Sequence, residues 1–318
     1  MVGVIRMTVR RLLLLVPLVM AVAFLVFVVV QFAPNDPAYN ALGTNATPAA
    51  RHAWIIAHGL NQPLPVQYLR FLGQALHGSL GVTQDTNQPV VQVVGRALPV
   101  TLALSAFGLV IAIVVAGLLG ATAAMYRNRW PDQVIRAVSM AGLATPSFWL
   151  GIMMIQFFAL HLGWFPSGGF VGPSQSFTGW LQSLALPSIA LGVPVGASLS
   201  RALRASMVEE LDKGYVRTAI GNGLPTVVVV GRNVLRNALV TPLTVLGLTV
   251  GTLIGGALVI ETIFDLPGMG TLLLHGVTNG DAGLVEGIVL TVAIGFILAN
   301  LAVDILLVFV NPRLRGGS

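Results

Sequence analysis

The chain has 318 residues, of which 55% are hydrophobic and only 9% charged, and its mean hydropathy is +0.87. Because soluble globular domains carry about a quarter charged residues, this composition excludes a soluble globular protein and predicts an integral membrane protein. The 17 Lys and Arg exceed the 11 Asp and Glu, but no basic run is interleaved with aromatic residues, which argues against nucleic acid as a partner. The absence of cysteine excludes disulfides and thiolate metal sites.

The first long apolar stretch covers residues 12–32 and follows Arg6, Arg10 and Arg11. This start resembles a signal peptide, but the apolar run is longer than a signal-peptide core and no A-x-A-like cleavage site follows it. Since about 20 apolar residues cross a bilayer, we predict a retained transmembrane helix.

The next segment, 34–96, is the longest loop, and it contains two short helices by its local signals. Thr47 is a helix N-cap, Pro48 suits the first helical position, and Gly59 can end the helix in the left-handed conformation. A second helix is expected over 65–76. These helices are expected to act as small lids or docking pieces on the outer face; a plain connecting loop is the alternative.

Five further apolar stretches bring the prediction to six transmembrane helices. They cover residues 97–126, 137–161, 181–200, 238–260 and 287–310. In the fourth predicted helix, Pro187 and Pro194 predict kinks, because each proline removes a backbone hydrogen bond.

The basic residues predict the orientation, because short cytoplasmic loops collect Lys and Arg. With the N-terminus inside, only Arg51, Arg70 and Arg96 lie outside, and the other fourteen basic residues lie inside. Both termini are therefore expected to be cytoplasmic, in a multi-pass protein of the cell (inner or plasma) membrane.

Three glycines repeat every four residues in the fifth predicted helix: Gly247, Gly251 and Gly255. Small residues at this spacing form a flat face on which another helix can pack closely. The face belongs to a subunit interface, to a pore lining, or to packing within the chain itself.

Asp304 is an ionisable residue within the last predicted helix, on the same face as Asn300. It either contacts the translocation pathway or a partner helix, or it lies near the inner interface and pairs with an arginine such as Arg136 or Arg313. No second acid follows it along a proton path, which argues against a proton-coupled carrier.

The loop 201–237 lies between the fourth and fifth predicted helices. Its segment MVEELDK brings Glu209, Glu210 and Asp212 close to three basic residues, Arg201, Arg204 and Lys213, in a solvated extension of the fourth helix. A two-turn helix with small exposed side chains follows, ended by Gly223 and Pro225. Such a helix can enter a cleft on a soluble partner, or it is a plain connector; the valines after Pro225 are expected to rest at the lipid boundary or under the bundle.

Catalytic motifs are absent. Lys213 is the only lysine, and no G-x-x-x-x-G-K-[ST] phosphate loop, G-x-S-x-G or H-E-x-x-H motif occurs. The five histidines lack zinc-like spacing; the nearest pair, His52 and His58, lies six residues apart. An enzyme is thus not expected, nor a metal site or cofactor in this chain.

Ordered motifs along nearly the whole chain resemble permease subunits of the dipeptide, oligopeptide and nickel group of ABC importers, in particular their dipeptide-permease B-type subunits. The segment YVRTAIGNG at Tyr215 resembles the EAA-type loop of that family, and VLRNALVTP follows it. The other similar segments are RRLLLLVP, APNDP, GLNQPLPVQYLRFLG, GSLG, RALPVTLALS, TPSFWLG, LGWFPSGG, ETIFDLPGMG and NPRLR.

The resemblance implies an all-α, six-helix type I importer fold in a single permease domain, 1–318, with an extracytoplasmic loop at 34–96 and a cytoplasmic coupling loop at 201–237. It implies a second homologous permease subunit, two ATPase subunits that bind ATP and Mg, and an external substrate-binding protein. The expected ATPase-coupling residues are Tyr215, Arg217, Thr218, Ala219, Asn222 and Gly223. The expected pathway or binding-protein face comprises Glu261, Asp265 and Asp304.

Two departures from the general pattern involve four residues. Arg217 replaces the motif glutamate, as is usual in the peptide branch, whereas Ile220, Gly221 and Asn222 replace a basic Arg-Ala-Lys, which makes this loop less charged. Peptides are the expected substrate, with nickel chelates, glutathione or haem as alternatives. A self-sufficient channel or carrier and an intramembrane enzyme are the alternatives from other classes.

Overall fold

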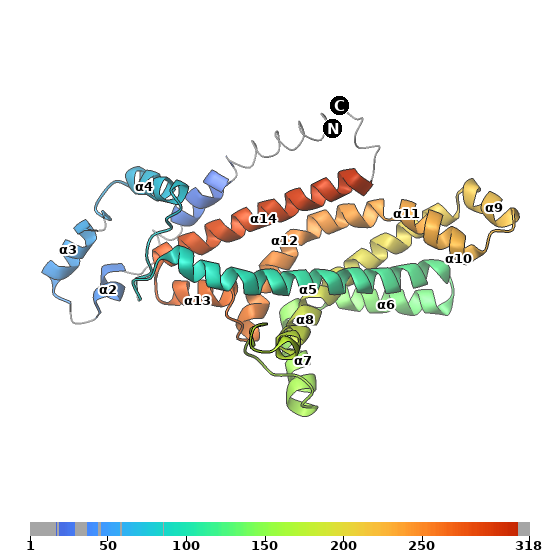
Figure 1. The fold of residues 1–318 in the computed structure, drawn as a ribbon, viewed down its shortest axis with the longest axis horizontal. Coiled ribbons are helices and arrows are strands. Elements are labelled where there is room, and N and C mark those ends of the chain that lie inside the picture. The colour runs from blue at the N-terminus through green and yellow to red at the C-terminus, as the bar shows by residue number, and fades with distance from the viewer. Residues whose placement is uncertain are drawn as a thin grey trace. The chain divides into compact units, whose positions relative to one another are not determined.

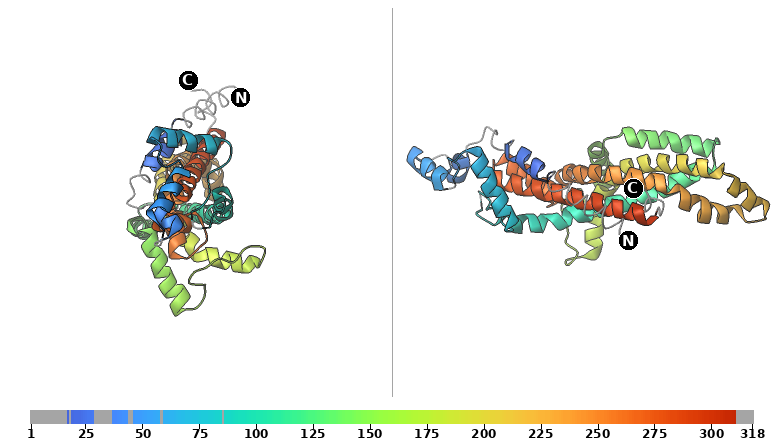
Figure 2. Two further views of the ribbon diagram at one scale, coloured as in Figure 1. Left: turned by 90° about the vertical axis from the view of Figure 1, so that its left-hand side faces the viewer. Right: turned by 90° about the horizontal axis from the view of Figure 1, so that it is seen from above.

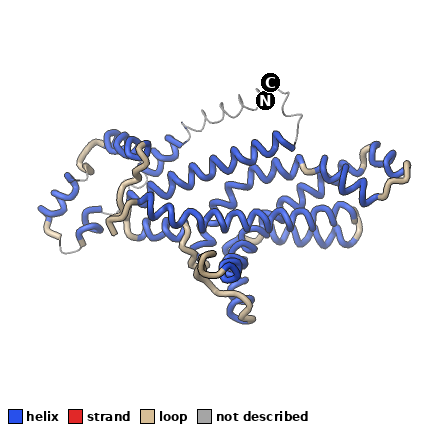
Figure 3. The backbone as a smooth tube through the Cα atoms, in the orientation of Figure 1, coloured by secondary structure: helices blue, strands red, loops and turns tan. Residues whose placement is uncertain are grey.

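The computed structural model describes residues 17, 19–28, 37–43, 46–57, 59–84 and 86–310 (Figure 1). Within these ranges the backbone is helical apart from its connections, and the only pairing of extended chain is an isolated bridge between Val82 and Pro89 (Figure 3). This confirms the all-α fold class. The chain forms two compact units, described separately below; that 1–318 act as one permease domain stays a prediction.

The larger unit contains residues 102–266 and the end of the last helix from residue 298. Its helices are the main part of α5 (Val90–Met125), α6 (Trp130–Ala144), α7 (Ser147–Met154) with η1 (Ile155–His161), α8 (Phe177–Leu211), α9 (Gly214–Gly221), α10 (Thr226–Val228), η2 (Val229–Val234), α11 (Leu235–Ala238), α12 (Val240–Ile263) and the end of α14 (Ala282–Val310). Helices α6 and α12 run beside α8 (Figure 2), and α7 packs against both α8 and α12.

Helix α8 is the central helix of this unit. In its most apolar 18 residues 67% are buried, compared with 22 to 33% for α5, α12 and α14. A Cβ atom on Gly196 would lie 2.9 Å from the carbonyl oxygen of Ala112 in α5, and one on Gly192 would overlap the carbonyl oxygen of Gly108. These glycines therefore let the backbones of α5 and α8 approach closely. The helix continues through both Pro187 and Pro194.

Four of the described helices are long and apolar enough to cross a membrane: α5, α8, α12 and the Ala282–Val303 part of α14. They contain most of the predicted stretches 97–126, 181–200, 238–260 and 287–310. Of the predicted first span, 12–32, residues Val19–Val28 are helical and much of the rest lies outside the described residues. The count of six transmembrane helices therefore stays a prediction.

In the structure the predicted span over 137–161 is divided between two helices, which together are long and apolar enough to cross a membrane as one bent span. Helix α6 ends at Ala144, α7 begins at Ser147, and the two axes differ by 100°. Thr145, which precedes Pro146, has an extended backbone with ψ of 120°. The physical reason is the proline, because its ring disfavours the helical conformation of the preceding residue.

The smaller unit contains the described residues up to Thr101 and residues 267–297. Its helices are Val19–Val28, α2 (Pro37–Leu42), α3 (Pro48–Ala57), α4 (Leu64–Leu76), the start of α5, α13 (Met269–Thr278) and the start of α14. The local predictions are confirmed here: the Ala50 N–H donates to Thr47 Oγ1 at 3.3 Å, and Gly59 has a φ of +68°.

Candidate functional site

The short helix α9 is fixed to α8 through one buried side chain. Val216 is only 2% exposed and belongs to an apolar cluster with Leu203 and Met207 of α8. The same cluster receives Val229 and Val234 from η2, so the chain on both sides of α9 packs on one core. Burial of a valine side chain stabilises by about 1.5–3 kcal/mol, and this holds α9 in place.

A polar contact adds to this apolar anchor. The Tyr215 hydroxyl donates to Glu210 Oε2 at 2.8 Å and accepts from Asn237 Nδ2 at 3.3 Å, while Lys213 Nζ donates to Glu210 Oε1. The hydrogen bond to Glu210 raises the pKa of Lys213, and partial burial raises the pKa of Tyr215. Tyr215 therefore keeps its proton at neutral pH and joins α9 to the end of α8 and to α11.

The opposite side of α9 is exposed. Arg217, Thr218 and Asn222 are exposed, and Ala219 is half-buried against the apolar cluster. The helix ends as predicted, because Gly223 has a φ of +83° and the Leu224 N–H donates to the Ala219 carbonyl at 3.2 Å. Glycine is favoured at such a left-handed position because it has no Cβ.

The structure thus divides the six residues expected in the coupling loop into two groups. Tyr215 and Ala219 take part in fixing α9, whereas Arg217, Thr218 and Asn222 face outward beside Gly223 at the helix end. The pattern of small residues did not identify Val216 as the buried residue of α9.

The valines after Pro225 lie in two environments. Val227 is 79% and Val228 48% exposed, whereas Val229 is buried in the apolar cluster at the start of η2. Ile220 of α9 and Leu224 just after it are exposed apolar residues as well. That these valines rest at the lipid boundary stays a prediction.

The predicted pairing of charges within the segment MVEELDK holds only in part. Glu210 pairs with Lys213, but Asp212 Oδ2 lies 2.7 Å from Arg127, and Arg204 binds Asp132. The physical reason is that α8 packs on α6, so Arg204 of α8 and Asp212 just after it face charges in and just before α6 instead of charges in their own segment. A single acid within the basic segment YRNRWPDQVIR was the available signal for Asp132.

The remaining expected site residues lie apart from α9. A Cβ on Gly247 would touch Val303 of α14 at 3.1 Å, Gly251 is half-buried, and Gly255 is exposed with nothing within 4 Å of a Cβ; the role of this glycine face stays a prediction. Glu261 is buried near the end of α12, while Asp265 is exposed with a φ of +50°. The backbone of Asp304 belongs to α14; its side chain lies outside what the structure describes.

Among the described residues, no three His, Asp or Glu side chains come together in a way that could hold a metal ion. His52 belongs to α3, and His58 lies outside the described residues.

Comparison with known proteins identifies the class of this chain. Residues 116–316 match the family of inner membrane components of binding-protein-dependent transport systems, and residues 4–105 match the N-terminal region of such components. The chain belongs to this family. It is a transmembrane subunit of an ABC importer, without an ATPase motif of its own.

Relatives cover almost the whole chain. One, from Brucella abortus strain 2308, is provisionally named a peptide transport system permease protein; it is 38% identical over 300 residues, which are 94% of this chain and 96% of that protein. The glutathione transport system permease protein GsiC of Pectobacterium atrosepticum is 37% identical over 307 residues, 96% and 98% of the two chains.

Among solved structures, an inward-facing conformation of the MetNI methionine ABC transporter has a TM-score of 0.58 at 19% identity. The match covers 69% of this chain and 97% of that one. It supports the type I importer fold.

Proposed function

We propose that this chain is one of two related permease subunits that together form the translocation pathway of an ATP-driven peptide importer. The observation that carries the proposal is α9: a two-turn helix fixed to α8 by Val216, with Arg217, Thr218 and Asn222 exposed on its outer side. A rigidly held helix that presents small and polar groups suits a groove on an ATPase subunit. Its position within the EAA-type segment supports this assignment.

In the proposed cycle, two ATPase subunits bind ATP and Mg and draw together the coupling helices of the two permease subunits. This movement switches the pathway between inward-open and outward-open states, so that substrate meets only one side at a time. An external binding protein delivers substrate to the face that includes the loop 34–96. Both termini are then cytoplasmic, which agrees with the distribution of Lys and Arg.

The substrate class rests on two supports. The relatives above carry names that refer to peptides and to glutathione, itself a tripeptide derivative. The described residues also contain no cluster of metal-binding side chains. Peptides are therefore the first candidate, ahead of nickel chelates and haem.

The test is reconstitution of the complete complex with its binding protein in lipid vesicles. We expect ATP hydrolysis to rise, and uptake to occur, with peptides and not with nickel chelates or haem. Uptake or ionic current through the purified single chain without nucleotide would contradict the proposal and favour a self-sufficient channel or carrier.

A further inference from the structure

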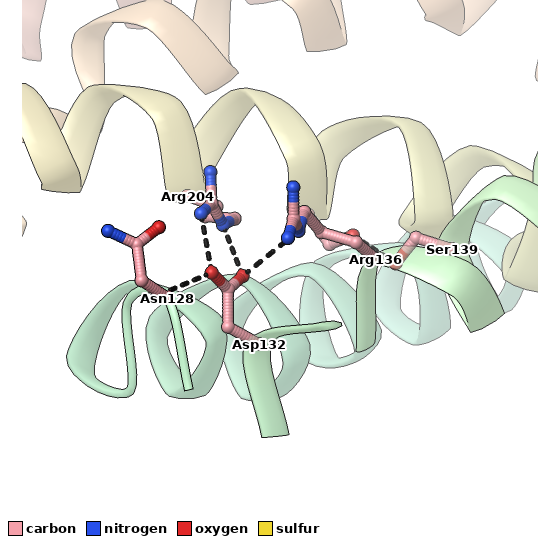
Figure 4. A network of polar contacts seen from close by, with 6 residues as sticks. Asn128, Asp132, Arg136, Ser139 and Arg204 are labelled. Carbon is pink, nitrogen blue, oxygen red and sulfur yellow. Dashed lines mark hydrogen bonds and ion pairs between the residues drawn. The ribbon is translucent and has the colours of Figure 1, made fainter. Parts of the chain in front are cut away.

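A buried ion pair joins α6 to α8 near α9. The side chain of Asp132 is fully buried, and Arg204 Nε and one of its terminal nitrogens each donate to a different carboxylate oxygen at 2.6 Å (Figure 4). The Asn128 N–H donates to Oδ2 at 2.9 Å, and Arg136 Nε lies 3.5 Å from Oδ1. Two parallel bonds fix the angle between the groups as well as their distance.

Two further polar contacts lie along the same pair of segments. Arg127, just before α6, pairs with Asp212, just after α8, at 2.7 Å, and both side chains are exposed. Ser139 and Ser200 lie with their hydroxyl oxygens 3.1 Å apart in a buried position. The three contacts therefore follow α6 and α8 in opposite chain directions, with the ion pair of Asp132 and Arg204 in the middle.

One end of this arrangement is the anchor of α9. Arg204 follows Leu203 in the chain, and Leu203 belongs to the apolar cluster that holds Val216. A displacement of α9 must therefore act on the turn of α8 that carries Arg204. Close packing in the cluster transmits such a displacement because a filled core resists compression.

The other end is the bent pair α6–α7. Beyond the 100° bend, Gly151 of α7 packs so closely that a Cβ would lie 3.1 Å from the ring of Phe264 and 3.5 Å from Ile260 Cδ1 of α12. The pair α6–α7 thus reaches from the anchor of α9 to the end of α12, where Glu261 is buried.

We propose that the pair of Asp132 and Arg204 is the joint through which movement of α9 reaches α6 and α7, so that ATP hydrolysis is coupled to opening of the pathway. This inference rests on the proposed function. Asp132 of α6 and Arg204 of α8 are positioning residues, because they act through α9 and do not themselves lie on its exposed side. Stability alone does not explain such a pair, because replacing a buried ion pair by apolar residues of similar volume is often neutral or stabilising.

The first experiment compares the complete reconstituted complex carrying Asp132→Asn with wild type. We expect the amount of substrate imported per ATP hydrolysed to fall by about tenfold, which is within the range of ordinary coupling free energies. Arg127→Gln is the matched control: it removes an exposed ion pair between the same two segments and is expected to change the ratio by about twofold or less. Equal effects of the two substitutions would overturn the proposal.

A second variant distinguishes a role of the ion pair in coupling from a role in stability alone. The double substitution Asp132→Leu with Arg204→Met keeps volume in the interface and is expected to retain the thermal unfolding midpoint, yet to lose coupling, since an apolar contact lets helices slide. If this variant imports as much substrate per ATP hydrolysed as wild type, the ion pair only stabilises the contact between α6 and α8, and the proposal is wrong. Failure of the wild-type complex itself to import peptides would instead contradict the proposed function.

A third test leaves the ion pair intact, so it does not depend on how the charge variants fold. Because the chain has no cysteine, Ser139→Cys with Ser200→Cys gives a single disulfide between α6 and α8 on oxidation. If the two helices move together, the oxidised complex transports as well as the reduced one. Loss of transport on oxidation with recovery on reduction would show that they slide and would overturn the joint.

Discussion

Gly223 illustrates how one residue sets the limits of α9. Its φ of +83° is a conformation that side chains with a Cβ adopt at a cost of about 1–2 kcal/mol, yet the space around a Cβ at this position is open. Gly223 therefore meets a backbone requirement, a positive φ, at a position where a partner can reach the end of α9 without meeting other residues of this chain.

This combination allows the two requirements to be tested separately. Gly223→Asn retains a small side chain that tolerates the left-handed conformation, and uptake should stay within about threefold of wild type. Gly223→Trp adds bulk where the ATPase is proposed to lie, and nucleotide-dependent uptake should be abolished while membrane insertion persists. The measurement is peptide uptake in vesicles at equal protein content; normal uptake by the Trp variant would refute docking at this end of α9.

Val216 carries the anchor of α9, so its truncation should loosen that helix. Val216→Ala removes two methyl groups from the apolar cluster, at an expected cost of about 1–2 kcal/mol. Amide hydrogen exchange should rise over Gly214–Gly221 and remain unchanged in the middle of α8. Exchange that rises equally along α8 would show that the cluster stabilises the whole unit and has no specific role in holding α9.

At the scale of elements, close packing of α5 on α8 depends on glycine. Gly196→Val places a branched side chain against the Ala112 carbonyl oxygen and Val115, where even a Cβ would lie within 3 Å. Overpacking of this kind costs about 1–3 kcal/mol or more. The variant should show a lower thermal unfolding midpoint in detergent.

The matched control is Gly117→Val in α5, at a position where nothing lies within 4 Å of a Cβ. It introduces the same side chain into a neighbouring helix and should leave the midpoint within a few degrees of wild type. A similar decrease of the unfolding midpoint in both variants would show that the effect comes from helix propensity or membrane insertion and not from the contact between the two backbones.

Elements whose signals are local could be predicted from the sequence, and contacts between distant segments could not. The cap at Thr47 and the ends at Gly59 and Gly223 follow from the conformational preferences of single residues. The break at Pro146 had a local signal too, but the uninterrupted apolar character of 137–161 favoured one helix. Asp132 and Arg204 lie 72 positions apart, and no periodicity within either helix indicates that they meet.

At the scale of the whole molecule, the orientation in the membrane is open to direct measurement because the chain has no cysteine. A single cysteine at Gly221 in α9 should react with an impermeant maleimide only when the cytoplasmic side is accessible, since the basic residues favour the inside. A cysteine at exposed Gln74 in α4 should react only from the outside. If the cysteine in α9 reacted only from the outside and the cysteine in α4 only from the inside, the predicted topology would be wrong, and a cytoplasmic ATPase could not reach α9.

The buried carboxylate of Asp132 also constrains how the protein is made. During synthesis it leaves the ribosome 72 residues before Arg204, so its final partner does not yet exist when α6 meets the membrane. Arg136, one turn further along α6, lies 3.5 Å from the Asp132 carboxylate and can balance its charge in the interval. We therefore expect the final packing of α6 to follow the insertion of α8.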